Sequence, residues 1–534
     1  MRILLVEPEY RKLIAKNRRD GKRLEDDMLW YPPLGLMKLA RFHRNRGDEV
    51  KFVVGRNREV LGDSNLFSTS RPWDRVYITT LFTFHFSDVV KTINFYVEAV
   101  GGTRSKVFVG GIMATLMREE IYKETGIVPI PGTLTSARQI GLQDDTNIDY
   151  LPPDYGILDD RYGINETFYA YTTRGCTNKC GWCGVPQLEP EYIPYIDIKG
   201  VIQGLRKEYE DRPILKLMDN NVLASPALSR IVSDLVELGY GHKQPIETQP
   251  RRYRVVDFNQ GVDATYLTEQ KMALLSQLNI EPMRIAFDNV SEKKDYVRAV
   301  RLARRYGVSH FSNYMLYNYR DTPKDLFERL KINIELNEEL MAEEGGKRSG
   351  KIYSYPMRYA PIRDLNGTGA NKHRDIIIGE YQAPRNWLTD AIWTKRFIRN
   401  VEIMKGVANG AISPTPTLAW RTMGHDYAEF LTNLYMPEEL IRNRNRHEKK
   451  VYDLEPIRDS GTGKVEGFRA FIRRLIEENG RRFRIFHNAV SSNSTAEIRA
   501  ALDGLEDGEL KKWLKMYIKQ DGLSPKQISL LEDN

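Results

Sequence analysis

The chain has 534 residues, of which 41% are hydrophobic and 28% charged, and its formal net charge is +8. This length is too great for one hydrophobic core, so we expect about two to four domains. The sequence contains no apolar run long enough to span a membrane, and the apolar start MRILLVEP is too short for a secretory signal. We therefore expect a soluble, cytoplasmic protein.

The first 125 residues alternate strands with helices. Short apolar segments typical of strands occupy residues 2–7, 49–55, 75–82 and 106–111. Segments with apolar residues at helical spacing occupy residues 32–47 and 87–100. This alternation predicts a doubly wound, Rossmann-like parallel sheet, whose ligands bind at the carboxyl ends of the strands. No GxGxxG motif follows any of these strands, so the sequence does not support a dinucleotide site.

Residues 126–166 are rich in Pro, Thr, Asp and Gly and are interpreted as a linker. The alternation then resumes, with strands predicted at residues 167–175, 214–221, 253–261, 282–289, 310–318 and 351–359. Helices are predicted between them, at residues 197–209, 227–239, 268–279, 292–307 and 323–341. Parallel β/α units in this number predict a partial (β/α)6 barrel over residues 167–359, with its chemistry at the C-terminal ends of the strands.

Residues 360–534 are predicted to form a mostly helical C-terminal domain, because apolar residues recur there at spacings of three and four. The predicted helices cover residues 386–405, 427–436, 467–479 and 508–520. The fold class is therefore α/β: a Rossmann-like domain (1–125), a linker (126–166), a partial barrel (167–359) and a helical domain (360–534). The last domain contains no catalytic motif, and we expect it to shape substrate access.

Basic residues cluster at positions 11–23, 442–450 and 481–484. Such runs are most often solvated surfaces. They are also compatible with a surface that binds RNA or another polyanion.

All three cysteines lie within eight positions, in the stretch YTTRGCTNKCGWCGVP. Three cysteines cannot form a complete disulfide framework, so the cluster indicates metal binding in a reducing compartment. Structural zinc requires four ligands, and the eight histidines all lie far from the cysteines in the sequence. A zinc site completed by a distant histidine remains an alternative. Three thiolates on a 4Fe–4S cluster would leave one iron free to bind a substrate or cofactor.

The stretch CTNKCGWC resembles the C-x3-C-x-aromatic-C motif of radical S-adenosylmethionine (SAM) enzymes, with Trp182 as the aromatic residue. The resemblance covers the predicted barrel. It implies that Cys176, Cys180 and Cys183 ligate a 4Fe–4S cluster whose open iron is chelated by the amine and carboxylate of SAM. It further implies that SAM is cleaved reductively to a 5′-deoxyadenosyl radical, which takes a hydrogen from the substrate, and that an electron donor such as flavodoxin or ferredoxin is a partner.

Polar residues at the ends of four consecutive strands are further candidates for SAM binding. Together with Trp182, the predicted SAM-binding residues are Asp219, Asn220, Asn221, Gln260, Asp263, Asp288 and Asn313. Many members of the family have Gly-Gly-Glu after the second strand, where this chain has LMDNN. Each candidate could instead cap a helix or form a turn, because Asp and Asn favour both.

The N-terminal region resembles, more weakly, the cobalamin-binding domain that precedes the barrel in one class of radical SAM enzymes. The matching stretches are residues 31–53 and the FVGG sequence that ends in Gly110 and Gly111. These glycines are equally typical of a turn. The D-x-H-x-x-G motif that supplies a cobalt ligand is absent, and residues 7–28 contain no histidine. We therefore do not favour bound cobalamin.

The sequence predicts a radical SAM enzyme acting on an unidentified substrate, which could be a small molecule, an RNA, or a peptide or protein. A cobalamin-dependent radical SAM methyltransferase is the nearest alternative. A metal-binding module without catalytic activity is the alternative from a different class. The oligomeric state is not predicted.

Overall fold

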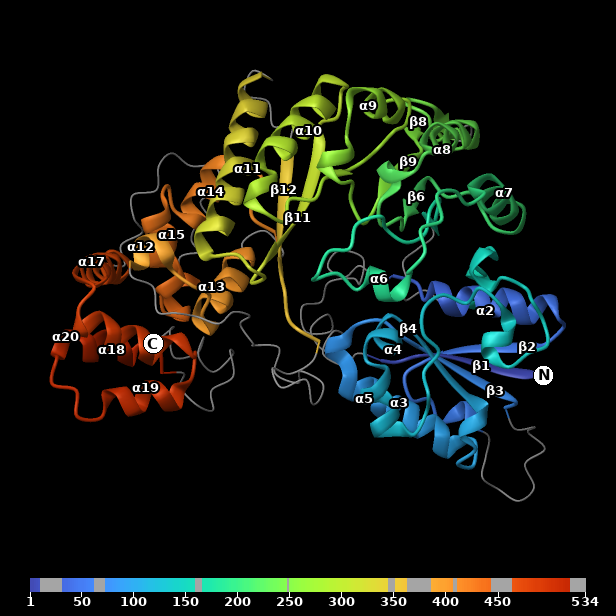
Figure 1. The fold of residues 1–534 in the computed structure, drawn as a ribbon, viewed down its shortest axis with the longest axis horizontal. Coiled ribbons are helices and arrows are strands. Elements are labelled where there is room, and N and C mark those ends of the chain that lie inside the picture. The colour runs from blue at the N-terminus through green and yellow to red at the C-terminus, as the bar shows by residue number, and fades with distance from the viewer. Residues whose placement is uncertain are drawn as a thin grey trace. The chain divides into compact units, whose positions relative to one another are not determined.

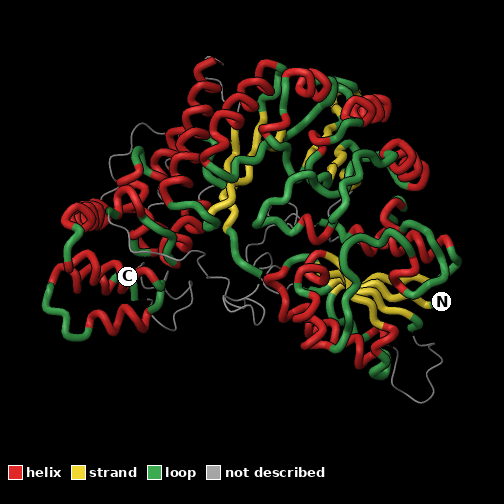
Figure 2. The backbone as a smooth tube through the Cα atoms, viewed as in Figure 1, coloured by secondary structure: helices red, strands yellow, loops and turns green. Residues whose placement is uncertain are grey.

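The computed structural model describes residues 1–9, 31–61, 73–158, 166–246, 249–343, 351–362, 386–406, 411–442 and 463–518. The chain divides into two compact units. The first comprises Met1–Ile285, Val297–Val308 and Pro361–Arg374; the second comprises Ala286–Tyr296, Ser309–Ala360 and Asp375–Asn534. Figures 1 and 2 show the elements of both units. The domain boundaries expected from the sequence stay a prediction.

The first unit begins with a four-stranded parallel sheet in the order β2-β1-β3-β4. Its strands are β1 (Arg2–Glu7), β2 (Glu49–Val54), β3 (Arg75–Thr80) and β4 (Val107–Gly111). The helices of this part are α2 (Leu34–Asn45), α3 (Phe86–Ala99), α4 (Ile112–Leu116) and α5 (Arg118–Thr125). All four strands and both helices predicted here are confirmed.

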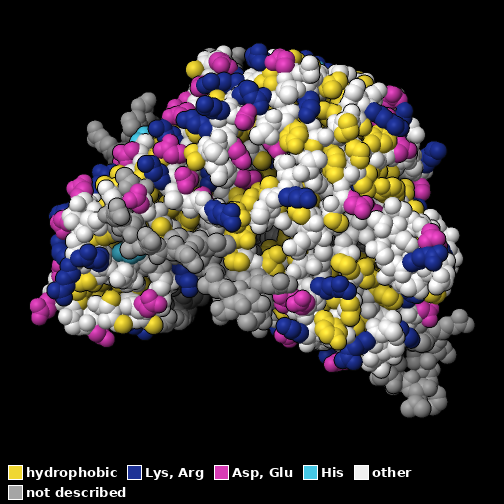
Figure 3. All heavy atoms as spheres, viewed as in Figure 1, with side chains coloured by type: hydrophobic (Ala, Val, Ile, Leu, Met, Phe, Trp, Pro, Cys, Tyr) yellow, Lys and Arg dark blue, Asp and Glu magenta, His cyan; other side chains and the backbone are white. Residues whose placement is uncertain are grey.

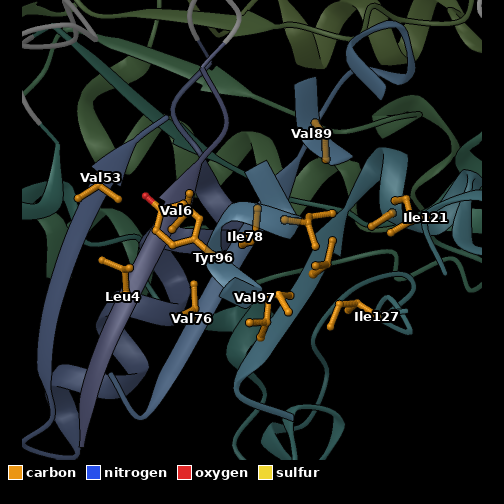
Figure 4. Packing of buried hydrophobic residues seen from close by; sticks show 14 of the residues in the cluster. Leu4, Val6, Val53, Val76, Ile78, Val89, Tyr96, Val97, Ile121 and Ile127 are labelled. Carbon is orange, nitrogen blue, oxygen red and sulfur yellow. The ribbon is translucent and has the colours of Figure 1, made fainter. Parts of the chain in front are cut away.

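The central strand β1 is apolar on both faces, as expected for a parallel strand that is covered on both sides, whereas the edge strand β2 exposes Glu49 and Lys51. In β1, Leu4 and Val6 belong to the core cluster that includes residues of α3 (Figure 4). The alternate residues Ile3 and Leu5 belong to the cluster that includes residues of α2. Because side chains alternate across a strand, one apolar hexapeptide contributes to two cores.

The segment interpreted as a linker packs against this sheet in its described part. Ala137, Ile140 and Ile148 are buried in the same cluster as Ile3 and Leu5. Its polar residues cap short 3-10 helices: Ser136 caps Ala137–Ile140 with a capping box, and Asn147 caps Ile148–Tyr150. The polar composition therefore reflects capping of packed turns as well as surface exposure.

The first unit continues with three parallel strands in the order β5-β6-β9. These are β5 (Thr167–Ala170), β6 (Ile214–Leu217) and β9 (Val255–Phe258). The associated helices are α6 (Val185–Leu188), α7 (Ile198–Glu208), α8 (Leu228–Leu235) with a π-helical turn (Val236–Tyr240), and α9 (Glu269–Leu275). A short strand β10 (Met283–Arg284) follows, and the next helix, α10 (Lys293–Arg305), has its first four residues in the second unit and the rest in the first. An antiparallel hairpin of β7 (Pro245–Ile246) and β8 (Gln249–Tyr253) was not predicted, because its polar sequence lacks the alternation of a half-buried strand.

The second unit contains two long parallel strands, β11 (His310–Tyr317) and β12 (Lys351–Arg358), and the helix α11 (Pro323–Glu343). The helices that follow are α12 (Trp387–Asp390), α13 (Lys395–Lys405), α14 (Pro416–Met423), α15 (Tyr427–Tyr435), α17 (Gly463–Glu478), α18 (Arg481–Ser491), α19 (Thr495–Leu502) and α20 (Gly508–Lys515). The prediction of a single helix over residues 386–405 is wrong. It is two helices, because the chain leaves helical geometry after Asp390 and Thr394 caps α13 with a bond from Phe397 N. Helices α14, α18 and α19 were not predicted.

Short 3-10 helices complete the described secondary structure. They are Glu59–Leu61, Thr83–His85, Arg104–Lys106, Ala137–Ile140, Ile148–Tyr150, Tyr155–Ile157, Val222–Ala224, Ala264–Tyr266 and Val290–Glu292. All six strands predicted between residues 167 and 359 occur. The predicted fold class is confirmed: α/β, with a Rossmann-like N-terminal sheet, the parallel β/α units of a partial barrel, and a mostly helical C-terminal region.

Basic and acidic side chains are interspersed on the face drawn in Figure 3. In the cluster at 481–484, Arg482 pairs with Asp507 at 2.7 Å and with Glu509 at 2.9 Å. The cluster at 11–23 and positions 443–450 lie outside the described residues. Within the part of the chain that the structure describes, no helix has both the length and the apolar character needed to cross a membrane.

Candidate functional site

The three cysteines lie in the loop between β5 and α6, at the carboxyl edge of the β5-β6-β9 sheet. Arg174 and Ile193 close the base of the loop with two backbone hydrogen bonds, of 3.0 and 2.9 Å. Gly175 has a φ of +71°, and a Cβ there would lie 2.3 Å from the carbonyl oxygen of Glu191. Only glycine fits at this position, so the bend before Cys176 is built into the sequence.

The thiols form no disulfide. Cys180 is exposed, and Cys176 and Cys183 are half-buried. The backbone N–H of Asn178 donates to Cys176 Sγ at 3.3 Å, and that of Val185 donates to Cys183 Sγ at 3.5 Å. Backbone donors of this kind stabilise a thiolate, the form of cysteine that binds metal.

The donor set fits an iron–sulfur cluster. Among the described residues, no three His, Cys, Asp or Glu side chains are arranged around a point suited to one metal ion. Thiolates on a 4Fe–4S cube bind different iron atoms, so they do not have to converge on one point. Three thiols in one loop, of which one is exposed and two are half-buried, therefore suit a cube with one iron left for another ligand.

Asp263, which follows β9, holds the middle of the cysteine loop. Its Oδ2 accepts a hydrogen bond of 2.8 Å from Asn178 Nδ2, while its Oδ1 accepts one of 2.9 Å from Thr265 N. Tyr266 OH lies 3.4 Å from Thr177 Oγ1. Asp263 thus caps a 3-10 helix and also contacts the loop. Its predicted contact with SAM stays a prediction.

Asp219, which follows β6, holds the start of the same loop. Its buried carboxylate accepts hydrogen bonds from the backbone and the hydroxyl groups of both Thr172 and Thr173, including one of 2.9 Å from Thr172 N and one of 2.7 Å from Thr173 Oγ1. Burial raises the pKa of Asp219, and the bonds from the two threonines only partly oppose this. These contacts assign Asp219 a role in positioning the loop, whereas its predicted contact with SAM stays a prediction.

Asn221 differs from its neighbours because its buried side chain is unsatisfied. The residue is 2% exposed, and neither Oδ1 nor Nδ2 has a hydrogen-bond partner among the described residues. A buried polar group without a partner costs about 1–3 kcal/mol. At a strand end beside the cysteine loop, such a group is available to bond a ligand or an ordered water. The adjacent Asn220 instead donates to Glu189 Oε2 at 3.0 Å.

A buried ion-pair cluster, not predicted from the sequence, ties the cysteine loop to the N-terminal region. Arg174 donates to Asp149 Oδ2 at 2.8 Å and to Glu189 Oε1 at 2.7 Å, and its guanidinium lies 3.4 Å from the ring centroid of Tyr171. On the other side of Asp149, Lys38 of α2 approaches Oδ1 to 3.0 Å. The cluster Lys38–Asp149–Arg174–Glu189 therefore joins α2, the segment interpreted from the sequence as a linker, and the base of the cysteine loop.

The electrostatics of this cluster follow from its burial and charge balance. Burial alone would raise the pKa of Asp149, but Lys38 and Arg174 outweigh it and lower that pKa to about 2. Burial lowers the pKa of Lys38, and Asp149 partly opposes this. Two cations meet two carboxylates, so each buried charge is compensated. Nothing in the sequence flagged Asp149, because it lies in a polar segment 25 residues before Arg174.

The remaining predicted residues lie at different places. Trp182 is half-buried within the cysteine loop, and Gln260 is exposed in the turn after β9. Asp288 and Asn313 belong to the second unit. There, Asp288 Oδ1 accepts from Leu316 N at 2.9 Å, and Asn313 is buried in a hydrogen-bond network described below. The structure thus brings Asp219, Asn220 and Asp263 together with the cysteine loop in the first unit.

At the carboxyl edge of the N-terminal sheet, Gly111 has a φ of +107° and a Cβ there would lie 2.3 Å from the carbonyl oxygen of Thr80. Thr80 Oγ1 donates to Gly110 O at 3.0 Å and accepts from Ala114 N at 2.8 Å. The close approach of β3 and β4 explains Gly111 without a ligand. Residues 10–28, on which the cobalamin prediction depends, lie outside the described residues.

No protein-family model and no curated protein matches this chain. Solved structures similar to it include the radical SAM methyltransferase TsrM from Kitasatospora setae with tryptophan substrate and the SAM analogue aza-SAM bound, at 15% identity and a TM-score of 0.44, covering 66% of this chain and 72% of that chain. TsrM with cobalamin and a 4Fe–4S cluster is similar at 14% identity and a TM-score of 0.44, covering 67% and 74%. The apo form of the cobalamin-dependent SAM radical enzyme OxsB is similar at 12% identity and a TM-score of 0.45, covering 100% and 80%.

Proposed function

We propose that the protein is a radical SAM enzyme, which holds a 4Fe–4S cluster on Cys176, Cys180 and Cys183 and modifies a substrate not yet identified. The observation that carries the proposal is the position of the three-thiol loop. It follows a strand at the carboxyl edge of a parallel sheet, and the next two strand ends hold it through Asp219 and Asp263. Active sites of parallel β/α units lie at this edge.

The cluster and SAM together would supply reductive cleavage of the sulfonium to methionine and a 5′-deoxyadenosyl radical. The chain's own residues bind and orient. Thr172 and Thr173 fix the start of the loop against Asp219, and Asn178 fixes its middle against Asp263. The unsatisfied amide of Asn221 offers one acceptor and one donor group to the polar end of a bound cofactor.

A cobalamin-dependent radical SAM methyltransferase is the second candidate, and an apolar surface on the N-terminal domain favours it. Phe82 and Phe84 follow β3, are 36% and 44% exposed, and stack with ring centroids 4.9 Å apart. Ile112, which follows β4, is 41% exposed. Apolar groups exposed at the ligand-binding edge of a Rossmann-like sheet suit a large, flat ligand.

The test of the first proposal is anaerobic reconstitution of the full-length protein with iron and sulfide, followed by electron paramagnetic resonance of the reduced protein. We expect a 4Fe–4S signal that changes when SAM is added, because SAM would bind at the open iron. A signal indifferent to SAM, or a colourless protein that retains zinc in place of iron, contradicts the proposal and favours a non-catalytic metal-binding module. Retention of hydroxocobalamin after desalting, with product formation dependent on it, would establish the second candidate.

A further inference from the structure

The cysteine loop returns to the sheet through a short arm, residues 189–193, which follows α6. This return arm packs closely on the outgoing chain, since a Cβ at Gly175 would lie 2.3 Å from the carbonyl oxygen of Glu191. Ile193, the last residue of the arm, pairs with Arg174 through two backbone hydrogen bonds. All three cysteines lie between the two residues joined in this way, so the return arm closes the loop that carries them.

One carboxylate of the return arm joins three donors. Glu189 Oε1 accepts from the guanidinium of Arg174 at 2.7 Å. Its Oε2 accepts from the backbone N–H of Gly175 at 2.6 Å and from Asn220 Nδ2 at 3.0 Å. The side chain of Glu189 is 13% exposed, and bonds to a charged acceptor are strong where water is largely excluded. A single oxygen atom therefore joins the residue before Cys176 to a residue that follows β6.

The return arm contacts the chain after β6 at a second point. Tyr192 OH donates to the carbonyl oxygen of Asn221 at 3.2 Å. Glu189 thus holds the side chain of Asn220, and Tyr192 holds the backbone of the next residue. The side chain of Asn221 is itself buried without a hydrogen-bond partner among the described residues. Two separate contacts therefore set the position of this amide relative to the cysteine loop.

We propose that Glu189 and Tyr192 are positioning residues, which hold Cys176 and Asn221 in the spatial relation needed to bind one SAM molecule across the cluster and the Asn221 amide. A ligand bound at two points requires those points to be held to within about 0.5 Å. The carboxylate of Glu189 suits this role, because an amide has one acceptor oxygen and cannot accept at both Oε1 and Oε2. The inference deepens the proposed function and rests on it, and it assigns neither residue a contact with SAM.

Titration of SAM into the reconstituted full-length protein, followed by electron paramagnetic resonance of the reduced cluster, tests the positioning role. Glu189→Gln should retain the wild-type iron and sulfide content, because all three cysteines remain. It should raise the SAM concentration at half-maximal spectral change by about tenfold or more, and Tyr192→Phe, which removes one neutral hydrogen bond, by about twofold to tenfold. A role confined to stability would lower the cluster content or the Tm and leave this SAM concentration unchanged.

Two control variants make the same chemical changes at residues that bond elsewhere. Glu208→Gln changes a glutamate of α7 that pairs with Arg41 and is 47% exposed. Tyr195→Phe removes a hydroxyl group that donates to Asp234 Oδ2 at 2.8 Å. Both variants should respond to SAM as the wild type does. Equal losses in Tyr192→Phe and Tyr195→Phe, or a wild-type SAM response in a Glu189→Gln protein with a complete cluster, would overturn the proposal.

A double variant tests whether Glu189 acts through Asn220. Asn220→Ala added to Glu189→Gln should weaken SAM binding little beyond Glu189→Gln alone, because both substitutions break the same link. Losses that multiply would show that the two residues act independently and would contradict the proposal. If Glu189→Gln does not fold, Tyr192→Phe keeps the charges of the loop, and a wild-type SAM response in that variant then counts against the proposal.

Hydrogen exchange of the cluster-free protein separates this inference from the proposed function. The Gly175 N–H should exchange about tenfold or more faster in Glu189→Ala than in the wild type, because its acceptor is removed. Unchanged exchange would overturn the role of Glu189 whether or not a cluster forms. Faster exchange in the variant, together with a wild type that never assembles a cluster, would retain the contacts of the return arm while the proposed function fails.

Discussion

Buried polar residues lie near strand ends in both units, but their bonding differs. In the second unit, Asn313 donates to Tyr296 OH at 3.2 Å and accepts from Asn333 at 3.0 Å, and Asn333 donates onward to Ser354 Oγ at 2.7 Å. Tyr296 OH completes the ring by donating to Asn333 Oδ1 at 2.8 Å.

In the first unit, Asn221 has no partner among the described residues, and Lys216 has an ion pair without a hydrogen bond. A satisfied network specifies a fold, whereas an unsatisfied buried group is available to a further partner, such as a ligand or an ordered water. We therefore assign different roles to Asn221 and Asn313, and their bonding rather than their place in the sequence distinguishes them.

The largest effect is expected from substitution of the cysteines, all three of which lie in the first unit. Cys176→Ala, Cys180→Ala and Cys183→Ala should each abolish retention of the cluster, because two thiolates do not hold a cube stably. Iron and sulfide content after anaerobic reconstitution and desalting measures this. Lys199→Ala, which changes a partly exposed lysine of α7, should retain the wild-type iron and sulfide content. A cysteine variant with the same content would remove that cysteine from the ligand set.

The next largest effect is expected in the buried ion-pair cluster. Arg174→Met should lower the free energy of unfolding by about 3–5 kcal/mol, because it removes one of the two cations that balance two buried carboxylates and leaves Glu189 without its ion pair in the cluster. Arg138→Met is the matched control, since its pair with Asp145 is at the surface and should contribute little. Urea unfolding measures both. If Arg174→Met and Arg138→Met lower the free energy of unfolding by similarly small amounts, the ion-pair cluster does not hold the cysteine loop in place.

The same cluster predicts a dependence of stability on pH. The pKa of Asp149 is lowered from 3.8 to about 2 in the folded protein. Asp149 therefore contributes about 2–3 kcal/mol of stability above pH 4, and this contribution is lost as the pH falls from about 4 to 2. Asp149→Asn should be less stable than the wild type at neutral pH, and the difference should shrink over this interval. If the difference in stability between the wild type and Asp149→Asn does not change with pH, the lowered pKa of Asp149 is contradicted.

The two asparagines give the most direct comparison between the units. Asn221→Ala should weaken SAM binding about tenfold to a hundredfold, since a hydrogen bond to a charged group contributes about 1.5–3 kcal/mol, and should cost little stability. Asn313→Ala should do the reverse: it should destabilise by about 1–3 kcal/mol, because partners are left unsatisfied, and leave SAM affinity unchanged. Equilibrium binding and urea unfolding of both variants decide this. Equal effects of the two substitutions on SAM affinity would contradict the different roles assigned to Asn221 and Asn313.

The sequence predicted the parallel strands of the N-terminal sheet well because they contain short apolar runs, as in β1 and β4. It also located the cysteine loop, because three cysteines within eight positions stand out in the sequence alone. The break at Thr394 was missed because residues 386–405 keep an apolar pattern across it. Long-range partners were missed for a physical reason: Asp149 and Glu189 acquire their roles only when folding brings them to Arg174.

The candidate SAM-binding residues could be proposed but not ranked from the sequence. Asp219 and Asn221 are two positions apart after the same strand. The Asp219 carboxylate accepts bonds from Thr172 and Thr173, whereas the Asn221 side chain has no hydrogen-bond partner among the described residues. Removing Asp219 is therefore expected to disturb the cysteine loop itself. The sequence alone favoured a direct contact of Asp219 with SAM.

The central claim, that the cysteine loop supports reductive cleavage of SAM, is tested most directly by measuring 5′-deoxyadenosine. The reconstituted full-length protein, given SAM and a strong reductant under anaerobic conditions, should produce 5′-deoxyadenosine, and Cys180→Ala should produce none. Formation of 5′-deoxyadenosine by Cys180→Ala at the wild-type rate, or its absence from a wild-type protein that holds a complete 4Fe–4S cluster, would contradict the claim.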